Sequence, residues 1–380
     1  MIKQLGRLAA GMAFLAVLTL AAAQAGAGTI TYTCDPSVAA STCDYLNTTI
    51  AGQYSSTFTN ASADIYIEYG TTALASTSSY LTEVSYSSYL SALAANTNQS
   101  SIQADALSAL HTYDSGAYGS GNVEITDGLG TALGLTAGLT GTTAGGAACS
   151  FPSAGCYNAV VTVTNDPATP LYYDNLGGPE AADAVDFYAT VEHQTNEVLG
   201  TSSCISTQGG SLSNACSASG AATPSAVDLF RYSAPGSLVL DSSLSTTPGA
   251  YFSYNGGLTN GANGFVYNTL ANGDDYADFV TNCSGGPLSL SVQDAEGCPG
   301  LDAGLNIRND GGAEINILNA VGYDVYPSTS TATPEPDSTL LTLSGIGFLL
   351  GWMLTMRKRL TFRAPFEPAS CLARCAQDLP

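Results

Sequence analysis

The chain has 380 residues, which is enough for one large domain or two ordinary ones with a full hydrophobic core. Its 31 acidic and 9 basic residues give a formal net charge of -22 at pH 7, and Arg231 and Arg308 are the only basic residues between positions 29 and 330. This balance argues against nucleic-acid binding, because phosphates are neutralised by clustered Lys and Arg. The two histidines, His111 and His193, are too few for a metal site with three histidine ligands.

Residues 1–27 have the parts of a secretory signal peptide. Lys3 and Arg7 precede an apolar run at 8–20, and small residues follow it up to Gly28. The run of thirteen residues is too short to cross a hydrocarbon core about 30 Å thick. We therefore expect cleavage after Ala25 or Ala27 and a mature chain outside the cytoplasm.

A second targeting signal is predicted near the C-terminus. A Ser/Thr-rich linker at 328–339 contains Pro334-Glu335-Pro336 and precedes an apolar span at 340–356 and the basic cluster Arg357-Lys358-Arg359, which places the tail in the cytoplasm. This order resembles the PEP-CTERM sorting signal of bacterial surface proteins. The resemblance implies processing by an exosortase-type enzyme and export toward extracellular polysaccharide. It departs from that signal in one respect, because 21 residues follow the basic cluster.

The cysteines of the exported region predict disulfides, because they are even in number and lie outside the cytoplasm. Eight cysteines allow 105 connectivities, and we expect each to pair with its neighbour in the sequence. A zinc ribbon is not expected, since there is no C-x-x-C doublet. The expected pairs are Cys34 with Cys43, Cys149 with Cys156, Cys204 with Cys216, and Cys283 with Cys298.

Hydrophobic patterning predicts both strands and helices within a single domain at 28–327. Alternating residues indicate strands at 63–69 and 159–164, and more weakly at 122–126 and 237–240. Helical patterns cover 79–95, 102–111 and 180–199. The last is the clearest, because Pro179 suits a first turn and Gly200 offers a left-handed stop. Frequent Gly-Gly and Asn-Gly pairs after 200 predict a loop-rich C-terminal half.

The helix predicted at 180–199 carries two candidate metal ligands. His193 and Glu197 are four residues apart and share a helix face, so both could bind one cation. H-E-x-x-H metalloproteases use this spacing for two zinc ligands, and the Glu at the second position of their motif takes a proton from the bound water. An exposed helical ion pair is the alternative interpretation of the same two residues.

Three separated segments carry a family resemblance. Residues 173–199, 228–236 and 317–325 are similar to the zincin-type metalloprotease-like proteins that many bacteria export with PEP-CTERM tails. The resemblance covers about 158–327 and implies an α+β zincin-like domain with a mixed sheet, an active-site helix and a divalent metal. In that family the helix reads His-Glu-x-x-Glu. Glu197 agrees with this pattern, whereas Gln194 replaces the general base.

The third ligand is less clear from the sequence. We prefer Asp228, because it lies in the second family-like segment, and keep Asp274, Asp275 and Asp278 as alternatives. His111 would complete a set of two histidines and one carboxylate, but a position at a helix end also explains it. The acidic loop at 273–278 is a second place where calcium could bind through oxygen ligands.

Taken together, these patterns predict an envelope-anchored metalloprotease-family protein that binds a divalent cation, with zinc as the expected ion. An amide cannot accept a proton near neutral pH, so peptide hydrolysis should be weak or lost at Gln194. The alternative is a non-catalytic extracellular matrix or adhesive surface protein. A sugar-binding module is a third possibility, which rests only on the 21 tyrosines. Extracellular polysaccharide or a peptide substrate is the expected partner outside the cell.

Overall fold

The computed structural model describes residues 28–96, 99–110, 121–173, 181–205, 216, 222–240, 249–268, 275–281, 283, 291–300 and 312–326. The described residues up to Tyr326 belong to one compact unit. The predicted signal peptide, linker, apolar span 340–356 and basic tail lie outside the described residues, as do His111 and Asp274. No helix within the described ranges is both long and apolar enough to cross a membrane.

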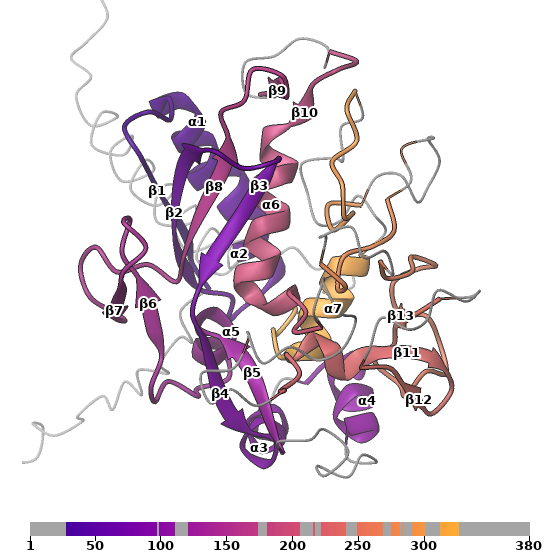
Figure 1. Cartoon of the computed structure of the whole chain (residues 1–380). Coiled ribbons are helices and arrows are strands. Elements are labelled where there is room, and N and C mark those ends of the chain that lie inside the picture. The colour runs from indigo at the N-terminus through magenta and orange to yellow at the C-terminus, as the bar shows by residue number, and fades with distance from the viewer. Residues whose placement is uncertain are drawn as a thin grey trace, which may run out of the picture. The chain divides into compact units, whose positions relative to one another are not determined.

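A four-stranded mixed sheet supports the candidate site (Figure 1). Its order is β1 (Ile30–Cys34), β2 (Ala63–Gly70), β8 (Ala159–Thr164) and β3 (Ala75–Ser79). The first three strands are parallel, and β3 pairs antiparallel with β8. Strand β8 is apolar and buried over most of its length, as expected for a strand covered on both faces. Strand β3 is one of the two edge strands of the sheet, and it lies beside the candidate site.

Helix α6 (Phe187–Asn196) packs against this sheet together with α2 (Ala51–Thr57) (Figure 1). Buried hydrogen bonds join them: the Tyr54 hydroxyl donates to the Glu192 carbonyl at 3.1 Å and to Asn196 Oδ1 at 2.8 Å. The Tyr32 hydroxyl of β1 also lies 3.0 Å from Thr195 Oγ1. These bonds tie the buried side of α6 to the sheet and to α2, which fixes the rotation of α6 about its axis.

The remaining elements surround this framework. A short α1 (Ala40–Tyr45) and a π-helical turn (Leu46–Ile50) precede α2. The other helices are α3 (Tyr86–Ala95), α4 (Ser101–Leu110), α5 (Asp127–Ala132) and α7 (Ala313–Val321). Two-stranded sheets pair β4 (Leu81–Ser85) with β5 (Asn122–Thr126), β6 (Thr140–Thr142) with β7 (Ala148–Ser150), and β9 (Leu171–Tyr172) with β10 (Val185–Asp186). A three-stranded sheet contains β11 (Arg231–Ala234), β12 (Ser237–Leu238) and β13 (Tyr251–Phe252).

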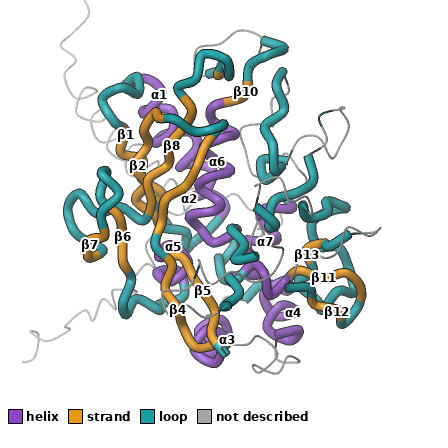
Figure 2. The backbone as a smooth tube through the Cα atoms, in the orientation of Figure 1, coloured by secondary structure: helices purple, strands orange, loops and turns teal. Residues whose placement is uncertain are grey.

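The structure confirms the α+β class with a mixed sheet, and loops dominate the described chain after α6 (Figure 2). The strands predicted at 63–69, 122–126 and 159–164 are confirmed. The helix predicted at 79–95 is wrong before Tyr86, because residues 81–85 pair with β5 and Ser85 caps α3. Strand β12 is shorter than the predicted 237–240.

The predicted disulfides are confirmed in all four pairs: Cys34–Cys43, Cys149–Cys156, Cys204–Cys216 and Cys283–Cys298. Each closes a short loop of neighbouring sequence. Disulfides persist in oxidising compartments, so these bonds indicate an extracellular or envelope protein.

Candidate metal centre

Helix α6 places His193 and Glu197 on one face, as the spacing predicted. The helix begins at Phe187 rather than near 180, because the Asp186 carboxylate caps it by accepting bonds from the Tyr188 and Ala189 amides. A π-helical turn from Glu197 to Thr201 follows it, with Gly200 in the predicted left-handed conformation at φ 109°. His193 Nε2 lies 3.5 Å from Glu197 Oε1, and both side chains are 13% exposed.

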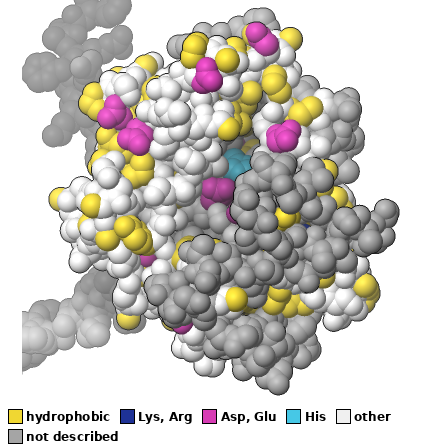
Figure 3. Space-filling view, in the orientation of Figure 1, with side chains coloured by type: hydrophobic (Ala, Val, Ile, Leu, Met, Phe, Trp, Pro, Cys, Tyr) yellow, Lys and Arg dark blue, Asp and Glu magenta, His cyan; other side chains and the backbone are white. Residues whose placement is uncertain are grey.

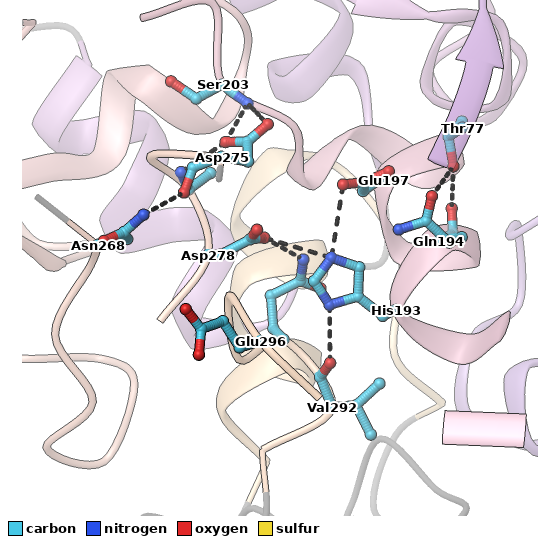
Figure 4. Close-up of polar contacts among 12 residues, drawn as sticks. Thr77, His193, Gln194, Glu197, Ser203, Asn268, Asp275, Asp278, Val292 and Glu296 are labelled. Carbon is cyan, nitrogen blue, oxygen red and sulfur yellow. Dashed lines mark hydrogen bonds and ion pairs between the residues drawn. The ribbon is translucent and has the colours of Figure 1, made fainter. Parts of the chain in front are cut away.

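Asp278 supplies a third donor from a loop far along the chain (Figure 4). Its Oδ1 lies 3.5 Å from His193 Nε2, and the donor atoms of His193, Glu197 and Asp278 all lie within 4.8 Å of one another. Ligand bonds of about 2.0–2.1 Å in a tetrahedral zinc site place neighbouring donors about 3.3 Å apart. The three donors are therefore close enough to hold one metal ion after side-chain adjustment.

The three donors line a pocket of about 400 Å³. Its walls come from β3, from α6 and from the segment 291–298. In the space-filling view the imidazole is visible in a hollow, beside carboxylate side chains (Figure 3). A cation held there would be reachable by a substrate from outside.

A second layer of hydrogen bonds orients the donors. His193 Nδ1 lies 2.9 Å from the Val292 carbonyl, and donation to that oxygen leaves Nε2 as the ligand atom. The Gln293 side-chain amide donates to Asp278 Oδ1 at 2.8 Å. The segment that contains Gln293 is also hydrogen-bonded to α7. The Ser291 hydroxyl and the Gln293 backbone amide both donate to Glu314 Oε1. Such secondary contacts commonly set the orientation of metal ligands.

The electrostatics of the group favour a bound cation. Burial by itself would lower the pKa of His193, but Asp278 and Glu197 more than offset it and raise the pKa to about 10. Burial and the nearby charges of Asp278 and Glu197 also raise the pKa of Asp275 well above its usual range. Carboxylates crowded into a partly buried site repel one another, and a divalent ion relieves this repulsion.

This arrangement predicts that His193 stabilises the metal-free protein less as the pH rises. Its pKa is raised from 6.5 to about 10, so its contribution is fully present below pH 6.5 and is lost through pH 10. We expect the difference in unfolding free energy between wild type and His193→Gln, on the order of a few kcal/mol at low pH, to shrink with rising pH. Urea unfolding of both proteins in a chelating buffer at about pH 6, 8 and 10 measures this difference in unfolding free energy. A difference that stays constant or grows would contradict the prediction.

Gln194 lies beside the donor group and lines the same pocket. Thr77 Oγ1, on the edge strand β3, donates to Gln194 Oε1 at 2.8 Å (Figure 4). Thr77 holds the amide oxygen of Gln194, and the amide nitrogen is the other end of the group. The nitrogen can only donate a hydrogen bond, whereas a general base needs an acceptor. Glu192 is fully buried and does not line the pocket, so it cannot take that role.

Asp228 is not part of the donor group, which corrects the preferred third ligand. Its carboxylate is buried and accepts bonds from the Cys204 and Ser225 amides at 2.9 Å, as well as from the Ser203 and Ser225 hydroxyls. Asp228 therefore joins the segment after α6 to the turn at 225. Asp278, one of the alternatives, takes its place beside His193. Asp275 is engaged by the Ser203 and Ala277 amides.

Sequence reasoning did not find three residues that shape the site: Thr77, Val292 and Gln293. Val292 contributes only its backbone carbonyl, so its side chain carries no signal. Thr77 and Gln293 are polar residues without a motif. Their roles come from segments that lie about 100 residues away from His193 along the chain.

The comparisons with known proteins identify no relative. No family model, curated protein or solved structure matches this chain. The function must therefore be inferred from the site itself.

Proposed function

We propose that this chain is an exported metalloprotease-like protein that binds one divalent cation, zinc, through His193, Glu197 and Asp278. The observation that supports the proposal is the convergence of these three donors, all within 4.8 Å of one another, in an open pocket. One imidazole nitrogen and two carboxylate oxygens suit zinc. The imidazole argues against calcium, which takes oxygen ligands. Bound zinc would polarise a scissile carbonyl and make its water more acidic.

We propose further that peptide hydrolysis is weak or lost. A hydrolase of this type needs a proton acceptor beside the attacking water, and Gln194 occupies that position. Thr77 holds the amide oxygen, so Gln194 can orient a water or a carbonyl by donating a hydrogen bond but cannot take a proton. The same observation favours the second candidate function, a non-catalytic matrix or adhesive surface protein in which the metal has a structural role.

The proposal also includes where the protein acts, which is outside the cytoplasm at the cell envelope. The disulfides agree with export, and the Pro-Glu-Pro motif at 334–336 with its basic cluster leads us to propose processing by an exosortase-type enzyme at the envelope. Extracellular polysaccharide or a peptide is then the partner outside the cell.

Metal content and proteolysis test the proposed function directly. Protein purified from an oxidising compartment without chelator should contain about one zinc per chain, because one three-ligand site is assembled. It should hydrolyse casein slowly or not at all, since general-base assistance of about 100- to 10,000-fold is missing. Plasma mass spectrometry measures the metal, and release of labelled peptide measures hydrolysis. Failure of the wild type and of Gln194→Glu to retain any divalent metal would remove the metalloprotease-like proposal.

A further inference from the structure

Arg231 is a buried cation next to the loop that carries Asp278. It begins β11, three residues after Asp228, and its side chain is 1% exposed. No other Lys or Arg is present in the described part of the chain. Its guanidinium carbon lies 5.2 Å from the centre of the Tyr267 ring and 5.8 Å from that of Tyr276. The second family-like segment, 228–236, thus places a charged residue in the protein interior.

The guanidinium joins two stretches of backbone that together hold the Asp278 loop. Nη1 donates to the Tyr276 carbonyl, and Nη2 donates to the Asn268 carbonyl at 3.2 Å. Asn268 in turn donates its backbone amide to the Asp278 carbonyl at 2.7 Å. Its side-chain amide donates to the Asp275 carbonyl at 3.4 Å (Figure 4). Arg231 therefore contacts the Asp278 loop directly at the Tyr276 carbonyl, and it contacts the neighbouring segment that bonds to this loop at the Asn268 carbonyl.

The charge of Arg231 also suits this position. Among the described residues no carboxylate comes within ion-pair distance of it, and burial lowers its pKa. Burying a cation is unfavourable unless hydrogen bonds and nearby charge offset the lost solvation. Two carbonyls, two aromatic faces and the more distant carboxylates of Asp228 and Asp275 supply that compensation. The planar guanidinium group can donate to both carbonyls at once, whereas the single ammonium group of lysine lacks this geometry.

We propose that Arg231 is a positioning residue, which holds the segment 275–279 so that Asp278 meets the cation beside His193. The inference rests on the proposed function, because it assigns to Arg231 the placement of one proposed ligand. Glu197 begins the π-helical turn that follows α6 and lies outside this loop. Arg231 should therefore act on the metal through Asp278 and not through Glu197.

Zinc affinity in a double-mutant cycle tests the proposal. The dissociation constant of zinc alone is measured with a competing chromophoric chelator for wild type, Arg231→Met and Arg231→Lys. We expect both variants to bind zinc about 10- to 100-fold more weakly, as is typical when a secondary contact of a ligand is lost. The same Arg231 substitutions are then made in Asp278→Ala and in Glu197→Ala.

The two backgrounds separate positioning from a general structural role. In Asp278→Ala, the Arg231 substitutions should change the zinc dissociation constant little, because the ligand that Arg231 positions is already absent. In Glu197→Ala they should weaken zinc binding as they do in the wild type. Equal losses in both backgrounds, or wild-type affinity in Arg231→Met, would overturn the proposal. If Arg231→Met does not fold, the same measurements are made with Arg231→Lys, which keeps the charge. A wild type that binds no zinc would instead contradict the proposed function.

Discussion

Gln194→Glu is expected to raise peptide hydrolysis by the zinc-loaded protein by about 100- to 10,000-fold, the usual contribution of a positioned general base. Thr77 Oγ1 donates to Gln194 Oε1 at 2.8 Å, and a carboxylate of the same shape can accept that bond. The new carboxylate would therefore be held in the orientation that the amide has now. It would lie in the pocket that contains His193 and Glu197. Initial rates of casein or peptide cleavage measure the effect.

Two further variants make this test specific. Gln194→Glu combined with His193→Ala should lose the gained activity, because the cation is no longer held. Gln194→Glu combined with Thr77→Val should keep zinc but lose part of the gain, since the carboxylate is no longer oriented. A wild type that cleaves as fast as Gln194→Glu would show that Gln194 is not the reason for weak hydrolysis.

Asp278→Ala should weaken zinc binding by more than the roughly 100-fold that a secondary contact can cost, because it removes one of the three proposed ligands. Asp228→Ala is the matched control, since Asp228 is also a buried aspartate but lies outside the donor group. It should keep zinc affinity in the folded protein. Its effect should appear instead in stability, because several donors that now bond to Asp228 would be left buried.

The stability part of this comparison is measurable by urea unfolding with zinc removed. Each buried donor left unsatisfied costs about 1–3 kcal/mol, so Asp228→Ala should lower the unfolding free energy by a few kcal/mol. Asp278→Ala should also lower the unfolding free energy, because the Gln293 side-chain amide loses its acceptor at 2.8 Å and His193 loses a carboxylate partner at 3.5 Å. Zinc affinity is therefore the measurement that separates the two variants. If Asp228→Ala abolished zinc binding in a folded protein while Asp278→Ala did not, Asp228 and not Asp278 would be the third ligand.

Local features of this protein could be read from the sequence because they depend on neighbouring residues. Alternation placed β2 and β8, and the four-residue spacing brought His193 of α6 and Glu197 of the turn that follows it together. The disulfides were predictable because each joins cysteines at most 15 residues apart. Patterning failed at 81–85, where pairing with a strand some 40 residues later overrides the helical pattern.

The third candidate donor and the orientation of the site were decided by tertiary structure. Asp228 was the natural choice in sequence, but the fold uses it to satisfy backbone amides and brings Asp278 to His193 from 85 positions along the chain. Thr77 and the Val292 carbonyl reach α6 across similar separations. The sequence alone thus predicted the disulfide pairs, which indicate an extracellular or envelope protein, and one helical pair of candidate donors, since these pairs follow from local spacing. Which loops close over that pair depends on long-range packing, which spacing does not encode.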